Sequence, residues 1–151
     1  KIMWLIFLAA DVGFLLGGFL SGRIIKRGST PPASRLWIML ASAFMVPVSF
    51  FVPAAATVNV VIAIGMLVAY AHTAWLGNLT ALVVDITPKR ILGTAFGVIA
   101  AGSALGGIFM NKLVAWFIDH HSYANCFYLM ACVHPIAIVL IWNLRKRSAA
   151  A

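Results

Sequence analysis

Hydrophobic residues fill five long runs of this chain, and polar residues gather in the short stretches between them. Each run is long enough to cross a bilayer as a helix, at a rise of about 1.5 Å per residue. The third run exceeds the length that one crossing needs, so we expect that helix to be tilted or to extend into the cytosol. The pattern predicts membrane spans at residues 2–22, 36–52, 58–86, 91–118 and 123–144.

A helix hairpin joins the third and fourth runs. The third run ends near Asp85, and the turn Thr87-Pro88-Lys89-Arg90 follows. Because Pro88 lacks an N–H and disfavours the α conformation of the residue before it, the helix should stop here. The sequence therefore predicts two membrane helices connected by a turn with a basic tip.

The composition agrees with a membrane protein. Of the 151 residues, 64% are hydrophobic and only 9% are charged, and the mean hydropathy is +1.05. A soluble domain has about a quarter of its residues charged. We predict an all-α, polytopic transmembrane helical bundle of five spans that has the lipid bilayer, and no nucleic acid, as a partner.

The net charge of +8 is distributed asymmetrically. The loops after the first and third spans and the C-terminal tail are basic, whereas the other two loops contain no lysine or arginine. Basic loops face the cytoplasm, so we expect the C-terminus to be cytoplasmic, in an integral protein of the cell (inner) membrane. The basic residues of these segments are Arg23, Lys26, Arg27, Arg35, Lys89, Arg90, Arg145, Lys146 and Arg147.

Small residues recur every four positions in two of the spans. Gly13 and Gly17 lie in the first span, and Gly93 and Gly97 lie in the fourth. Small residues on one face allow helix backbones to approach closely in lipid. We predict that these four glycines form helix interfaces, which could serve static packing or sliding during a conformational cycle.

Polar residues form a stripe along the third span. His72, Trp75, Asn78 and Asp85 follow one another at helical spacing. Polar groups in a membrane span are costly and face a cavity or a partner helix. The amide of Asn78 suits sugar hydroxyls or a carboxylate, and Trp75 offers a flat face for a sugar ring. We predict His72, Trp75 and Asn78 as substrate-binding residues; the alternative is hydrogen bonding between helices.

Three charged residues are candidates for coupling or gating. Asp11 lies in the middle of the first span, where a carboxylate could take part in proton coupling or accept hydrogen bonds from a neighbouring helix. Asp85 lies near the cytoplasmic end of the third span, beside Lys89 and Arg90. We interpret Asp85 and Arg90 as members of a gate or of an ion-pair network between loops.

No motif for catalysis or metal binding is present. The chain contains neither His-Glu-x-x-His nor Gly-x-Ser-x-Gly. The turn Asp119-His120-His121 has two adjacent histidines, which rarely converge on one ion. We predict that the protein is not an enzyme, has no catalytic residues and uses no metal or other cofactor.

Two segments resemble a known family. Residues 8–28, LAADVGFLLGGFLSGRIIKRG, look like the eighth helix and following loop of major facilitator superfamily transporters. Residues 75–107, WLGNLTALVVDITPKRILGTAFGVIAAGSALGG, are similar to the tenth and eleventh helices of its anion:cation symporter branch, of the hexuronate or sugar-acid type. One position departs from the pattern: the family loop has an acidic residue before its first arginine, where this chain has Gly22. The charge-relay role of that acid is therefore not carried over.

The resemblance implies a secondary active transporter with twelve helices. Residues 1–151 would be part of its C-terminal six-helix bundle, helices eight to twelve, and would pack against N-terminal helices that the sequence lacks. The implied activity is proton-coupled symport of a small organic anion such as a hexuronate or other sugar acid. The alternative is a membrane scaffold or channel subunit that assembles through the glycine-rich helix faces.

Overall fold

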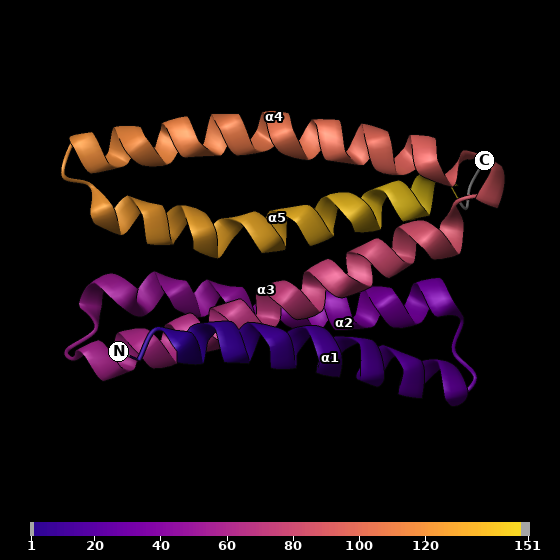
Figure 1. The fold of residues 1–151 in the computed structure, drawn as a ribbon, viewed down its shortest axis with the longest axis horizontal. Coiled ribbons are helices and arrows are strands. Elements are labelled where there is room, and N and C mark those ends of the chain that lie inside the picture. The colour runs from indigo at the N-terminus through magenta and orange to yellow at the C-terminus, as the bar shows by residue number, and fades with distance from the viewer. Residues whose placement is uncertain (1, 149–151) are drawn as a thin grey trace.

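Five long helices run alternately up and down in the computed structural model, which describes residues 2–148 and the side chains of residues 2–143 (Figure 1). Within the described residues there is no strand, and all five membrane-length segments are apolar enough to cross a bilayer. The prediction of an all-α membrane bundle is confirmed. The elements are α1 (Trp4–Lys26), α2 (Pro31–Met45), the 3-10 helix η1 (Val46–Ala54), α3 (Val58–Ile86), the 3-10 helix η2 (Lys89–Ile91), α4 (Leu92–Asp119) and α5 (Tyr123–Ser148).

The alternating directions bring the basic segments to one end of the bundle. The α1–α2 loop, the α3–α4 turn and the last turn of α5 lie at the same end in Figure 1. We call this the basic end. The side chains of Arg145, Lys146 and Arg147 lie outside the described ones, although their backbone belongs to α5.

The α1–α2 loop is shorter than the sequence indicated. Gly28 takes the left-handed conformation, with φ 97°, which reverses the chain after α1. Thr30 is the extended N-cap of α2, and prolines occupy the first helical positions, where a missing N–H costs no hydrogen bond. The helix therefore begins at Pro31 rather than Leu36, and Arg35 lies in the helix instead of in the loop.

The second crossing changes helix type halfway. After Met45 the chain continues as the 3-10 helix η1, which contains Pro47 and Pro53. Each proline lacks an N–H and disrupts regular α-helical hydrogen bonding. Thr57 then caps α3, where its hydroxyl oxygen accepts a hydrogen bond from the Val60 N–H at 3.4 Å.

The turn between α3 and α4 forms where the sequence predicts it. Thr87 is extended, with φ −100° and ψ 128°, as expected for a residue before proline. One short 3-10 turn, η2, follows Pro88 and carries Lys89 and Arg90. At the opposite end His121 adopts a left-handed conformation, with φ 55°, between α4 and α5.

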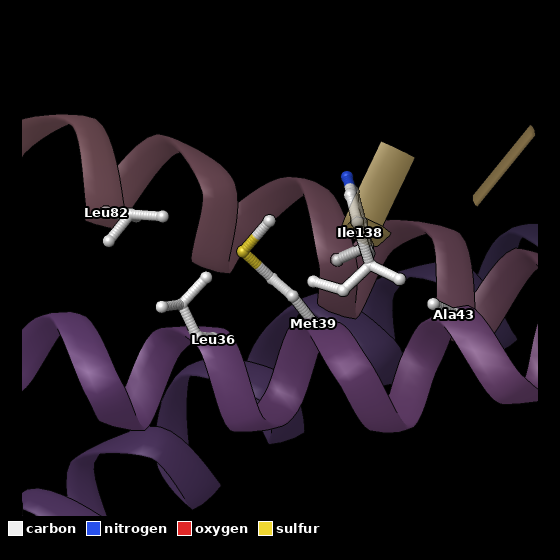
Figure 2. Packing of buried hydrophobic residues seen from close by; sticks show 6 residues of the cluster. Leu36, Met39, Ala43, Leu82 and Ile138 are labelled. Atoms are coloured by element: carbon white, nitrogen blue, oxygen red, sulfur yellow. The ribbon is translucent and has the colours of Figure 1, made fainter. Parts of the chain in front are cut away.

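The packed core lies toward the basic end, where α2, α3 and α5 meet. Figure 2 shows Leu36, Met39 and Ala43 of α2 directed toward Leu82 of α3 and Ile138 of α5. Trp75 of α3 completes this cluster. Met39 has no exposed surface, so the side chains fill this part of the bundle tightly.

Helix α4 differs from the others because it packs mainly on α5 and contains no buried residue. Figure 1 shows α4 at the outer edge of the bundle, beside α5. In a membrane this exposed apolar surface contacts lipid or other helices.

Candidate functional site

A pair of histidines connects α3 and α5 near their midpoints. Nδ1 of His72 and Nε2 of His134 lie 3.2 Å apart and share a hydrogen bond, with the donor set by the tautomer. The two rings are nearly perpendicular, with centroids 5.3 Å apart. His134 is partly buried, and its second ring nitrogen, Nδ1, is buried without a hydrogen-bond partner within the described residues.

A cavity of about 850 Å³ extends from this pair toward the end opposite the basic one. Its walls come from the first halves of α1, α3 and α5, from η1, and from the second half of α4. Among its lining residues, His72 on α3 and His134 on α5 are the ones nearest the basic end. The histidine pair therefore forms the inner limit of the cavity.

The cavity wall is largely apolar. Valine, isoleucine, leucine and methionine supply most of it, and the side chains with polar or sulfhydryl groups are His72, His134, Ser49 and Cys126. The Ser49 hydroxyl donates to the Phe127 carbonyl at 3.3 Å, which ties η1 to α5. The two imidazoles are thus the main groups in this wall that can exchange protons or bind an anion.

Trp75 and Asn78 follow His72 along α3 toward the basic end, and both are buried inside the protein. The ring of Trp75 contacts that of His134 edge to face, with centroids 5.3 Å apart, and belongs to the packed core. Asn78 is 1% exposed; its Nδ2 donates to the Ala74 carbonyl at 2.9 Å, while its Oδ1 has no partner within the described residues. Of the three residues predicted to bind substrate, only His72 lines the cavity in this conformation.

The contact between α1 and α3 depends on two of the predicted glycines. A Cβ atom on Gly17 would lie 2.9 Å from both the Cα and the Cβ of Ala74, closer than packed atoms allow. A Cβ atom on Gly13 would collide with the carbonyl of Tyr70 and with the hydroxyl of Thr73. The backbones of α1 and α3 therefore approach closely at Gly13 and Gly17.

Gly93 and Gly97 have different surroundings. A Cβ atom on either residue would meet nothing within 4 Å. Both residues are exposed on α4, so they form no close interface with the helices described here. Their role as helix contacts remains a prediction that requires a neighbour from outside these residues.

A polar network connects three helices near the basic end. The Arg35 guanidinium donates from Nε to Oδ2 of Asp85 at 3.2 Å and from an Nη atom to the hydroxyl of Ser21. The Ser21 hydroxyl donates to the Gly18 carbonyl at 2.9 Å. The ion-pair partner of Asp85 is therefore Arg35 on α2, rather than the neighbouring Lys89 or Arg90. This network fastens the ends of α1, α2 and α3 together.

The other two charged candidates are separate from this network. Asp11 is exposed on α1 and Arg90 is exposed in η2, and within the described residues neither forms a hydrogen bond or ion pair. The structure does not bring Asp11, Asp85 and Arg90 together. Their predicted roles in coupling or gating stay predictions.

The residues around the α4–α5 turn do not converge either. The Nδ1–H of His120 donates to the Trp116 carbonyl of its own helix at 2.8 Å, and its ring packs against that of Trp116. Among the described side chains, no group of three His, Cys, Asp or Glu residues has the arrangement of a metal site.

Two residues of these networks were missed in the sequence. His134 carries the same signal as Asp11, a polar side chain within an apolar span. For Arg35, the two preceding prolines indicate a loop, although the helix begins at the first of them. Both polar contacts join residues at least 50 positions apart, so local spacing does not reveal them.

Comparison with known proteins identifies the family. The model of the Major Facilitator Superfamily matches residues 2–151, which is nearly the whole chain. Searches of curated proteins and of solved structures found no significant match. The family match agrees with the five apolar helices and their alternating directions. This chain is an integral membrane protein with the architecture of a transporter, and it belongs to the major facilitator superfamily.

Proposed function

We propose that this chain is part of a secondary active transporter that carries an organic anion together with protons. The observation that supports this proposal is the cavity that ends at His72 and His134. Imidazoles can hold a proton and, when charged, bind an anion. In transporters of this kind, two helical bundles rock around a site near the membrane midplane, and the histidines occupy the middle of their helices.

The charge distribution supports an orientation. With the basic end in the cytoplasm, the cavity lies in the outer half of the bundle, and the C-terminus is cytoplasmic in the cell (inner) membrane. The core of Leu36, Met39 and Leu82 and the Arg35–Asp85 ion pair would then lie on the cytoplasmic side. We infer an outward-facing arrangement, in which substrate enters from outside and the inner half is sealed.

The resemblance to helices eight to twelve supports placing the chain in the C-terminal half of a twelve-helix protein. In that arrangement the missing N-terminal helices would cover the far side of the cavity and the exposed face of α4. We also infer that the main charged residues that couple proton movement to substrate movement lie on those N-terminal helices.

The wall of the cavity favours one type of anion. A hexuronate presents hydroxyl groups around its ring, and each hydroxyl that enters an apolar site without a partner costs about 1–3 kcal/mol. The polar side chains of the wall are too few to pair with all of them. Within the organic anions that the resemblance indicates, we therefore favour a carboxylate with an apolar body over a sugar acid.

Uptake by the full-length protein in liposomes tests this proposal. Radiolabelled hippurate, with one carboxylate, one amide and an aromatic ring, has fewer polar groups than glucuronate. Uptake of the two anions is compared under an inward proton gradient and after its collapse by a protonophore. We expect gradient-dependent uptake of hippurate above that of protein-free liposomes, and weaker uptake of glucuronate. A preference for glucuronate would restore the sugar-acid assignment, and no uptake of either anion would contradict organic-anion symport.

A further inference from the structure

We propose that His72 and His134 form a single proton-binding site, which takes up one proton together with the carboxylate of a substrate in the cavity. This inference rests on the proposed function for the identity of the substrate. It adds His134 of α5 to the site and gives the number of protons bound with each substrate. The argument depends on the geometry of the pair and on the composition of the cavity wall.

The spacing of the two nitrogens determines how many protons the pair holds. Because His72 Nδ1 and His134 Nε2 are 3.2 Å apart, one of them must carry a hydrogen and the other a lone pair. One additional proton converts one ring to an imidazolium and leaves this hydrogen bond intact. A second would place two N–H groups head to head between two positive charges, which repel each other strongly at this distance. The pair therefore accepts one proton and resists another.

The two histidines have different access to substrate. His72 is exposed to the cavity, and its Nε2 is not engaged in the pair. His134 is more buried, with the edge of Trp75 against its ring and its Nδ1 shielded. An incoming carboxylate therefore accepts a hydrogen bond from His72. His134 does not contact the carboxylate and stabilises the positive charge through its hydrogen bond to His72.

No other charged group of the wall competes for this role. The residues lining the cavity from α1, η1 and α4 have no titratable side chains, and α5 adds only the Cys126 thiol besides His134. On α3, His72 is the one titratable residue of the lining. A charged pair thus has no carboxylate counterion within the described cavity wall until a substrate supplies one. Proton and anion therefore bind cooperatively, since each lowers the electrostatic cost of the other.

Calorimetry with hippurate tests the number of protons. Titrations of the full-length protein at pH 8, in two buffers that differ in ionisation enthalpy, report the protons taken up per bound anion. We expect about one proton per hippurate in the wild type, since the pair accepts one proton and resists another. The double variant His72→Gln/His134→Gln should reduce this number to near zero and weaken binding roughly tenfold, since a charge-assisted hydrogen bond becomes a neutral one.

His120→Gln is the matched control, because His120 faces its own helix at the outer turn. It should leave both the affinity and the proton number unchanged. If the double variant still takes up one proton per hippurate, the pair is not the proton site, although proton-coupled transport would stand. If the wild type binds hippurate with no proton uptake, the inference fails as well.

A second measurement is independent of the substrate. In nitrogen-15 NMR spectra of the full-length protein labelled at histidine, the resonances of His72 and His134 are assigned through His72→Gln and His134→Gln. We expect the two rings to share one protonation step, with a scalar coupling across the N–H···N bond. If both rings change to the spectrum of an imidazolium in a single transition on acidification, the inference is overturned, even if hippurate is not the substrate. The shared step would support it even if hippurate does not bind.

Discussion

Helices α1 and α4 have the same spacing of small residues, yet one is tightly packed and the other is exposed. Gly13 and Gly17 lie against the backbone of α3, whereas Gly93 and Gly97 have no atom near the position of a Cβ. The α1 contact also has a specific partner: the hydroxyl of Thr73 donates to the Ala10 carbonyl across the interface. Glycine spacing thus provides a smooth helix surface, and the opposing helix determines whether that surface is used.

The largest expected effect is at the packed stripe. Gly13→Leu should destabilise the full-length protein by about 3 kcal/mol or more, because the added atoms meet the Tyr70 carbonyl and the Thr73 hydroxyl. Thermal unfolding in detergent and the yield of monodisperse protein measure the loss. Gly18→Leu on the same helix is the control, since a Cβ at Gly18 meets nothing within 4 Å. Equal losses in both variants would contradict the α1–α3 interface.

The polar network should contribute less than this close contact. In a double-mutant cycle with Arg35→Ala and Asp85→Ala, we expect a coupling energy of about 1 kcal/mol, typical of a partly exposed ion pair. The two side chains are 18% and 22% exposed, so solvent screens them incompletely. The same cycle with Arg90→Ala should give no coupling to Asp85. A larger coupling to Arg90 than to Arg35 would favour the loop network that the sequence predicts.

A smaller loss of stability is expected when the hydroxyl group of Thr73 is removed. Thr73→Val keeps the side-chain shape and removes the hydrogen bond to the Ala10 carbonyl, so the full-length protein should lose about 0.6 kcal/mol of stability. Thr80→Val is the matched control, because the Thr80 hydroxyl donates to the Leu76 carbonyl of its own helix at 2.9 Å. Indistinguishable unfolding curves for the two variants would show that glycine packing alone determines the α1–α3 pairing.

No loss of stability is expected at the exposed stripe. Gly97→Leu should leave the isolated 151-residue chain at least as stable as the wild type, because a Cβ there meets nothing within 4 Å and a glycine inside a helix is itself unfavourable by about 1 kcal/mol. The same variant is then measured in the twelve-helix protein proposed above. A loss that occurs only there would show that a helix from outside this chain packs on α4. A loss in the isolated chain would show that α4 already packs closely against its own neighbours.

The sequence is sufficient to predict where the helices lie, but it does not predict the polar contacts between them. The apolar runs predicted all five spans, and Pro88 marked the hairpin between α3 and α4. The predicted start of α2 at residue 36 is wrong, because prolines are common in loops and equally suited to the first positions of a helix, where α2 has them. Helical spacing placed Trp75 and Asn78 on one stripe, but it could not show whether that stripe faces a cavity or another helix. That choice depends on the crossing of α1, α2 and α5 over α3, a property of the tertiary fold.

The edge contact between Trp75 and His134 also provides an optical signal. An imidazolium accepts an electron from an excited indole, whereas neutral imidazole does so poorly. Protonation of His134 should therefore quench the fluorescence of Trp75. The 151 residues contain five tryptophans, and Trp75 is isolated by replacing the other four, and any tryptophan elsewhere in the full-length protein, with phenylalanine. Emission should fall on acidification and stay constant when His134 is changed to Gln. Light emitted from the packed core would then report each proton that reaches the inner limit of the cavity.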